Sequence, residues 1–225
     1  MGPKNKPIAE NAWQVGGSGF SAAADAAAYL VASGGEAILV DAGCGGATDL
    51  LLANVESTGV ALDRVNTLLL THCHFDHAGG AAEIRRRLGC RTAAHHLDAS
   101  AIEAGDHQVT AADWYDATMN PCPIDVRLSG DELLPLGSTS LQVIWIPGHS
   151  PGSLAFLMDS GGKRVLFAQD VHGPLHPALH SNRDDYQASL RRLIDLRADI
   201  LCEGHYGVFN GADAVARFIR GFLSE

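Results

Sequence analysis

The sequence has little positive charge and no closely spaced cysteine pairs, and each shortage excludes a class of protein. Its 225 residues include 16 lysines and arginines against 26 aspartates and glutamates, a formal net charge of −10. Because a nucleic-acid-binding protein needs a basic face for the phosphates, we expect no nucleic acid partner. The five cysteines form no Cys-x-x-Cys pair and are odd in number, so neither a disulfide framework nor a thiolate zinc knuckle is predicted. Free thiols are typical of the reducing cytoplasm, where we place the protein.

Long apolar stretches are missing as well, so we expect no membrane association. An alanine-rich segment, residues 22–32, is interrupted by Asp25 and is too short to span a bilayer. The first residues lead into no long apolar stretch, so no secretory signal is predicted. Hydrophobic residues make up 46% of the chain and no linker divides it, which predicts one large domain over residues 1–225. The expected partner is a small-molecule substrate, and the sequence leaves open whether the protein forms a homo-oligomer.

Short apolar runs alternate with helical patterns along the chain. The predicted strands are residues 28–31, 37–40, 67–70, 141–146, 154–158, 165–168 and 199–202. The predicted helices are residues 49–58, 81–88, 185–197 and 212–222, and Gly89 is expected to end the second of them. Strands in hairpins are thus mixed with strand–helix–strand units. This mixture favours a layered α/β or α+β domain over a pure parallel sheet.

Metal-ligand side chains crowd into one segment directly after the predicted strand 67–70. His72 and His74 are two residues apart, so in an extended chain they point the same way and can bind one ion. Asp76 and His77 follow where the chain turns into the next helix, and they can face a second ion beside the first. Imidazole and carboxylate ligands suit zinc. The sequence therefore predicts a site for two metal ions.

Three further ligand-type residues follow three later strands. His149 comes after the strand 141–146, Asp170 closes the run that begins at Val165, and His205 follows the strand 199–202. Ligands in layered α/β domains gather at the carboxyl ends of strands. We therefore expect these residues to complete the coordination that the first segment cannot supply alone.

In their order and spacing these motifs resemble the metallo-β-lactamase superfamily. The family signature is a His-x-His-x-Asp-His loop, then Gly-His, then an aspartate after a strand, then a final histidine. Asp41, in Val-Asp-Ala-Gly, matches the early aspartate that supports the metal loop from behind. The resemblance covers the chain from about residue 28 to residue 208. It implies an α+β fold, the four-layer αββα sandwich, with metals at one edge between two sheets.

The resemblance also implies a division of the ligands. The first ion would be bound by His72, His74 and His149, the second by Asp76, His77 and His205, with Asp170 bridging both. Aspartate at position 170, in place of the cysteine of some zinc β-lactamases, is more similar to the thioesterase, lactonase and phosphodiesterase branches, glyoxalase II included. Position 173 is Gly where acyl-homoserine lactonases have a nearby Tyr, and the Cys-Gly-Arg run of glyoxalase II is missing.

The predicted activity is hydrolysis of an ester, thioester or lactone bond of a small molecule. Two divalent ions, zinc first and iron or manganese as alternatives, would activate a bridging hydroxide. Asp76 is the candidate to orient this hydroxide and move its proton. His172, in a loop with two prolines, is the candidate substrate contact or proton donor, and Tyr206 is a candidate donor to the oxyanion.

Two other functions fit the same residues. One is a mononuclear iron dioxygenase of the persulfide dioxygenase type, with its ion held by His72, His74, His149 and Asp170. The other is a non-catalytic metal-binding sensor. Two zinc ions per chain would favour hydrolysis, one iron with oxygen uptake would favour the dioxygenase, and full metal loading without turnover would favour the sensor.

Overall fold

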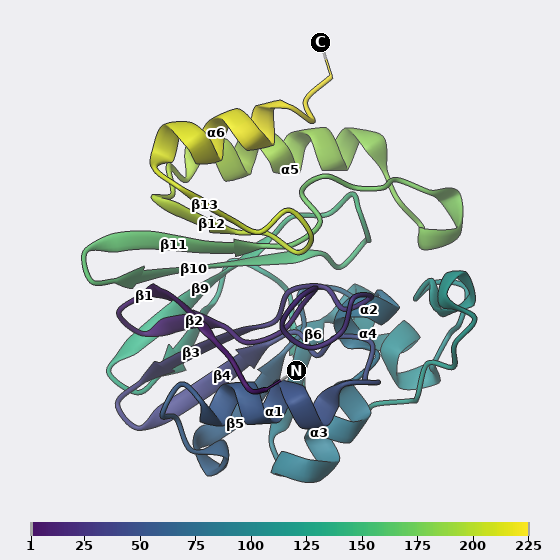
Figure 1. The fold of residues 1–225 in the computed structure, drawn as a ribbon. Coiled ribbons are helices and arrows are strands. Elements are labelled where there is room, and N and C mark those ends of the chain that lie inside the picture. Colours follow the sequence, from purple (N-terminus) through teal and green to yellow (C-terminus); the bar gives the residue numbers. More distant parts are fainter. Residues whose placement is uncertain (1, 225) are drawn as a thin grey trace.

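Two mixed β-sheets packed face to face form the framework of the computed structural model, which describes residues 2–224 (Figure 1). The first sheet has its strands in chain order: β1 (Lys6–Ala9), β2 (Ala12–Gln14), β3 (Tyr29–Ser33), β4 (Glu36–Val40), β5 (Val65–Leu69), β6 (Arg91–His95) and β7 (Val126–Leu128). The second sheet runs in the order β13-β12-β11-β10-β9-β8. Its strands are β8 (Leu133–Leu136), β9 (Thr139–Trp145), β10 (Leu154–Ser160), β11 (Lys163–Ala168), β12 (Ile200–Cys202) and β13 (Val208–Asn210).

Helices cover the outer face of each sheet, which completes the predicted αββα sandwich (Figure 1). The first sheet is covered by α1 (Thr48–Glu56), α3 (Ala81–Leu88) and α4 (His96–Ala104), and the second by α5 (Arg183–Asp195) and α6 (Ala212–Arg220). The short helices are α2 (Phe75–Ala78), η1 (Leu62–Arg64), η2 (Ala112–Tyr115) and η3 (Pro177–Leu179). Within the described range, no helix has both the length and the apolar character needed to cross a membrane.

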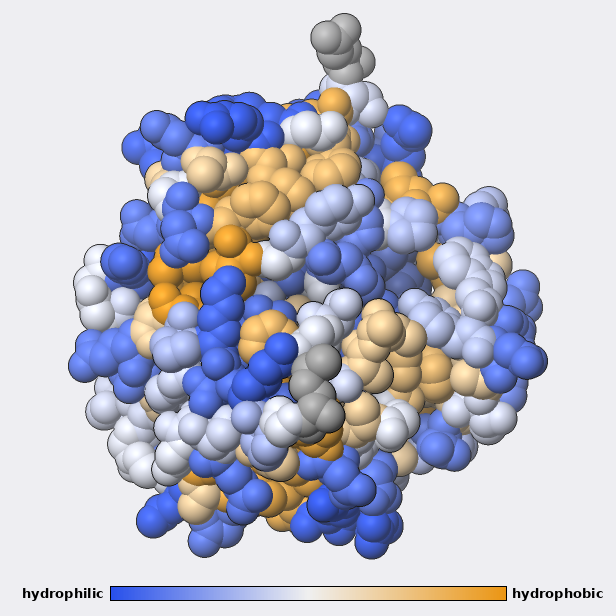
Figure 2. All heavy atoms as spheres, in the orientation of Figure 1, coloured by the Kyte–Doolittle hydropathy of each residue, from blue (hydrophilic) through white to orange (hydrophobic). Residues whose placement is uncertain are grey.

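Three apolar layers hold the sandwich together. Successive side chains of a strand point to opposite faces, so each sheet contributes apolar side chains to two of these layers. In β4, Leu39 packs with the helices of the first sheet, whereas Ile38 and Val40 lie between the two sheets. Across that middle layer the rings of Tyr29 and Phe167 are 5.4 Å apart. The third layer lies between the second sheet and the pair α5 and α6. Figure 2 shows a largely hydrophilic surface on this side, with hydrophobic residues in several separate patches.

Every predicted strand and helix is present, with ends shifted by a few residues. Gly89 ends α3 in the left-handed conformation, with φ of 63°, as predicted. Helix α5 begins two residues early because the Asn182 side chain accepts hydrogen bonds from the backbone N–H groups of Asp184 and Asp185. The unpredicted elements include β1, β2, β6, β7, β8, β13 and α4. Strand β6 reads Arg-Thr-Ala-Ala-His, a composition poor in strand-forming residues, and it is held by pairing with both neighbours.

The carboxyl ends of several strands meet at one edge of the sandwich. Strands β4 and β5 run parallel, as do β11 and β12, so the loops that follow them leave on the same side. The loop after β9 reaches this edge too, where the Leu154 N–H donates to the Thr71 carbonyl at 2.8 Å and joins the two sheets. Residues far apart in sequence are brought together here.

Candidate metal centre

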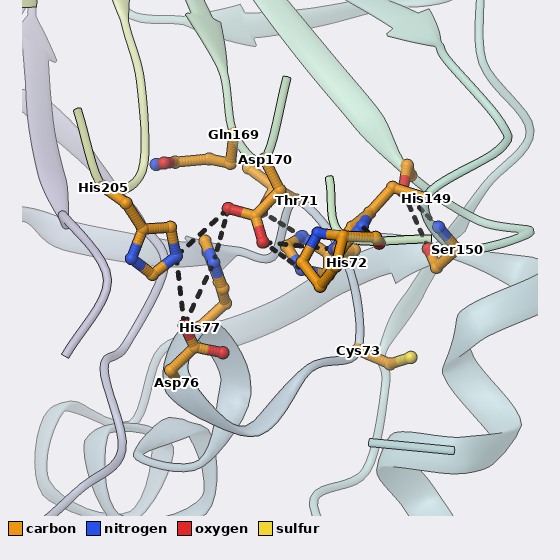
Figure 3. Close-up of polar contacts among 12 residues, drawn as sticks. Thr71, His72, Cys73, Asp76, His77, His149, Ser150, Gln169, Asp170 and His205 are labelled. Carbon is orange, nitrogen blue, oxygen red and sulfur yellow. Dashed lines mark hydrogen bonds and ion pairs between the residues drawn. The ribbon is translucent and has the colours of Figure 1, made fainter. Parts of the chain in front are cut away.

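The Asp170 carboxylate lies at the middle of a group of imidazoles from both sheets (Figure 3). Its Oδ2 is 3.1 Å from Nε2 of His149 and 3.7 Å from Nε2 of His72. Its Oδ1 is 3.1 Å from Nε2 of His77 and 3.3 Å from Nε2 of His205. The two oxygens of one carboxylate therefore face two different pairs of histidines.

The structure brings together all seven residues that the sequence predicted as ligands. Their potential ligand atoms lie within 4.8 Å of one another in two groups: His72, His74, His149 and Asp170 in the first, and Asp76, His77 and His205 in the second. In the second group, Oδ2 of Asp76 is 3.2 Å from Nε2 of His205. The predicted division between two ions matches these groups, and the assignment of each ligand to an ion stays a prediction. Cys73, between two of the histidines, points away from the cluster (Figure 3), as an extended chain requires.

The donor set fits metal ions, as its buried nitrogens indicate. The Nε2 atoms of His72, His74, His77 and His149 are buried and find no hydrogen-bond partner within residues 2–224. A buried polar atom without a partner costs about 1–3 kcal/mol, so four of them at one point would be strongly destabilising in a purely structural cluster. Cations bound between them would satisfy all four lone pairs.

Hydrogen bonds behind the cluster fix the tautomers that metal binding needs. Asp41 Oδ2 accepts from Nδ1 of His77 at 2.8 Å and from the Thr71 hydroxyl at 2.7 Å. Because that hydroxyl proton is committed to Asp41, we assign the proton between Thr71 and His72 to Nδ1 of His72, 3.1 Å away. Likewise, Nδ1 of His149 donates to the Pro174 carbonyl at 2.8 Å. With Nδ1 occupied in this way, each of these histidines directs its Nε2 into the site, where a metal ion could bind it.

Asp41 supports the metal loop as the resemblance implied. It is fully buried, directly follows β4 and has a left-handed backbone with φ of 63°. Its Oδ1 also accepts the Thr71 N–H at 2.8 Å. Burial raises the pKa of this carboxyl, although its bonds with His77 and Thr71 oppose the shift. Asp170 has a left-handed backbone too, with φ of 50°, so the turns after β4 and β11 both depart from strand geometry.

The two ligand groups differ in protonation in the metal-free protein. Burial lowers the pKa values of His72 and His74, and neighbouring imidazoles lower them further, so both are neutral at pH 7. Burial also acts to lower the pKa of His205, but bonds with Asp170 and Asp76 outweigh it and raise the value to about 10. Metal binding to the second group must therefore displace protons.

Asp98 links the two loops that carry the first group, a role that no sequence pattern indicated. Its Oδ2 accepts the Cys73 N–H at 3.0 Å and the Ser150 hydroxyl at 2.7 Å, and its Oδ1 accepts the Gly152 N–H at 2.7 Å. A Cβ atom on Gly152 would fall only 2.5 Å from this Oδ1, so the contact requires glycine there. In sequence, Asp98 resembles any acidic residue in the first turn of a helix.

His172 and Tyr206 differ in their relation to the site. His172 lines the cavity at the metal cluster, and its Nδ1 is 2.8 Å from Oε1 of the buried Glu203. Tyr206 is 61% exposed and does not line that cavity. Its ring lies 5.0 Å from the ring of His172, so any influence on the site would pass through that histidine. Sequence analysis missed Glu203, which also accepts the backbone N–H groups of His205 and Tyr206.

Comparison with known proteins places this arrangement in a family. The family model of the metallo-beta-lactamase superfamily matches residues 24–205. Acyl-coenzyme A thioesterase MBLAC2 of Homo sapiens is 29% identical over 197 residues, which cover 78% of this chain and 68% of that protein. A hydroxyacylglutathione hydrolase of Anaeromyxobacter dehalogenans is 37% identical over 126 residues, covering 56% of this chain but only 39% of its own length.

Solved structures agree on the fold. The MIM-2 metallo-beta-lactamase superposes with a TM-score of 0.83 at 20% identity, over 98% of this chain and 88% of its own. LRA-12, a class B3 di-zinc metallo-beta-lactamase from an Alaskan soil metagenome, gives a TM-score of 0.76 at 26% identity, over 91% of this chain and 79% of its own. The predicted αββα fold is confirmed, and the named relatives confirm the predicted hydrolase class. The chain therefore belongs to the metallo-β-lactamase superfamily.

Proposed function

We propose that the protein is a binuclear metal-dependent hydrolase that cleaves an ester, thioester or lactone bond of a small molecule. The proposal is carried by the Asp170 carboxylate, whose two oxygens face separate pairs of imidazole nitrogens. A single ion would leave one of these pairs without a cation. Zinc is the first choice, because the donor set is imidazole and carboxylate and because the similar LRA-12 is a di-zinc enzyme, while iron and manganese are alternatives. The relatives named as thioesterase and hydroxyacylglutathione hydrolase support the bond class.

The residues of the site have distinct tasks in this proposal. When bound, two divalent ions would supply Lewis acidity and lower the pKa of water toward ~7. Asp170 contacts both ligand groups and fixes their relative positions. Asp76 orients the attacking water and takes its proton. His172, held through Nδ1 by Glu203, lines the cavity and protonates the leaving group. Tyr206 packs on His172 and restricts its ring orientation.

Metal analysis and a substrate panel test the proposal together. Protein purified without chelator should contain two zinc ions per chain and should hydrolyse at least one class in a panel of acyl thioesters, esters and lactones. One iron per chain with oxygen uptake would overturn the proposal in favour of the dioxygenase. Full metal loading without turnover on any class would overturn it in favour of a sensor. The cytoplasmic location and the oligomeric state stay predictions.

A matched pair of variants tests the catalytic role of one ligand. Asp76→Asn should lower kcat by about 100- to 10,000-fold, the usual contribution of a positioned proton acceptor. Asp159→Asn, at an exposed position of β10, is the control and should leave kcat unchanged. Equal activity in the two variants would remove Asp76 from the mechanism.

A further inference from the structure

We propose that the cavity beside the metal cluster is a binding subsite for a short, uncharged acyl group, with Trp114 and Tyr115 as one of its walls. The inference rests on the proposed function, because the acyl carbonyl must reach the metal cluster. It goes further in naming the part of the substrate that the protein selects and the residues that select it.

The cavity is polar at one end and apolar elsewhere. Its volume is about 180 Å³, and the residues at its polar end include Asp76, His149 and Asp170. Beyond the apolar residues of η2, its lining includes Ala111, Pro174 and Leu179. A substrate whose reactive carbonyl is polar and whose acyl chain is apolar matches this division.

Two aromatic side chains at this cavity remain partly exposed. Trp114 is 53% exposed and Tyr115 is 39% exposed, although ordinary packing would bury such rings. Both line this cavity. Exposed apolar residues are common singly, but two neighbours lining the cavity at the metal cluster point to a ligand surface.

The aromatic wall is fixed to the metal loop. The Phe75 N–H, within the signature segment, donates to the Thr110 carbonyl at 2.7 Å. The Tyr115 ring lies 5.5 Å from the Phe75 ring. The segment around η2 is therefore attached to the same loop that carries His74 and Asp76, which places the wall beside the cluster.

The opposite wall is fixed as well, and the two walls meet. The loop after β11 is held by the bond from Nδ1 of His149 to the Pro174 carbonyl and by the Ser181 hydroxyl, which donates to the His149 carbonyl at 2.6 Å. The rings of Trp114 and His176 are 5.3 Å apart and perpendicular, which joins the two loops. In Figure 1 these loops lie together at the right of the sandwich, in teal and green.

The lining chemistry defines the acyl group. No lysine or arginine lines the cavity among the described residues, so an acyl chain that carries its own carboxylate would find no cation beyond the metal centre. Such a carboxylate would lose its hydration against Trp114 and Leu179 without compensation. An uncharged aliphatic chain gains from the same surface.

The cavity volume limits the length of that chain. A volume of about 180 Å³ is below the ~300–1,000 Å³ of pockets that bury a drug-sized ligand, so we expect it to hold only a short acyl chain, on the order of six carbons. Each buried methylene should raise kcat/KM about fourfold until the cavity is full. Longer chains must pass into solvent, so the increase should stop near six carbons.

A chain-length series tests the subsite. The zinc-loaded protein would be assayed with straight-chain acyl thioesters of N-acetylcysteamine, and with the matching p-nitrophenyl esters, from two to ten carbons. We expect kcat/KM for hexanoyl to exceed that for acetyl by on the order of one hundredfold, with a plateau beyond. Trp114→Ala should lower this hexanoyl-to-acetyl ratio by about tenfold or more, and Trp114→Phe should restore most of it. Leu133→Ala, an exposed apolar position on the distant β8, is the control and should leave the ratio unchanged.

A binding measurement separates this inference from the proposed function. The dissociation constants of acetate and hexanoate for the zinc-loaded protein would be measured by calorimetry, without any turnover. Hexanoate should bind more tightly than acetate, and Trp114→Ala should remove most of the difference. Turnover that does not depend on chain length, or an equal hexanoate preference in Trp114→Ala, would overturn the subsite while leaving the hydrolase in place. A hexanoate preference with no turnover of either substrate series would support the subsite and count against the hydrolase.

Discussion

Replacing Asp98 by asparagine should loosen the metal centre although Asp98 touches no ligand atom. The aspartate accepts three hydrogen bonds, from the N–H groups of Cys73 and Gly152 and from the Ser150 hydroxyl. Asparagine has the same shape, but it has no charge and only one acceptor oxygen. The change therefore isolates the electrostatic part of the link from its packing.

The size of the expected loss in stability and in zinc affinity follows from these three hydrogen bonds. In the variant, the amide oxygen of the new side chain can take the place of Oδ2 and keep the bonds from Cys73 and Ser150, but its NH₂ then faces the Gly152 N–H. A buried N–H left without an acceptor costs about 1–3 kcal/mol, and loss of charge from the two remaining bonds costs about 1 kcal/mol each. We expect Asp98→Asn to lower the free energy of unfolding by about 3–5 kcal/mol. The loops of His74 and His149 should also separate slightly, which lowers zinc affinity by about 10- to 100-fold.

Urea unfolding of the chelated protein measures the first effect, and competition with a chromophoric chelator measures the second. The cobalt-substituted protein gives a further readout, because a change in ligand geometry alters its visible absorption bands. Asp213→Asn, an exposed acidic residue in the first turn of α6, is the matched control and should change neither quantity. A loss below about 1 kcal/mol with unchanged zinc affinity would refute the role of Asp98.

Three other outcomes follow from the same geometry. Asp41→Asn should weaken zinc binding by about 10- to 100-fold, because the amide oxygen can replace Oδ2 but the NH₂ then faces the Thr71 N–H, and the charge that orients His77 is lost; chelator competition would measure the effect. Zinc binding should release protons and weaken as the pH falls, because the pKa of His205 is raised to about 10 and its proton must leave when zinc binds. Calorimetry in buffers of different ionisation enthalpy would detect the released protons. A binding enthalpy that does not depend on the buffer would contradict this prediction. Ile84→Ala, in the layer between α3 and the first sheet, should cost about 2–5 kcal/mol in urea unfolding without changing zinc stoichiometry.

The candidate ligand residues could be picked out because their signal is local. His72, His74, Asp76 and His77 lie within six residues, and the other ligands follow strands whose apolar runs are plain in the sequence. The longer strands and helices were predictable for the same reason, since their periodicity is complete within one segment. Strands such as β2, β7 and β13 have only three residues each, too few to show a period.

The sequence by itself determined the family, the types of the candidate ligands and their order along the chain. Only the tertiary structure decided which carboxylate links the two ligand loops and which aromatic residues line the cavity. Asp98 contacts Cys73 and Gly152 across separations of 25 and 54 residues, and Trp114 contacts His176 across a separation of 62 residues. The reason is physical. A hydrogen bond or ring contact between distant segments forms only when the sheets have paired, and it produces no periodic pattern in the sequence of either segment.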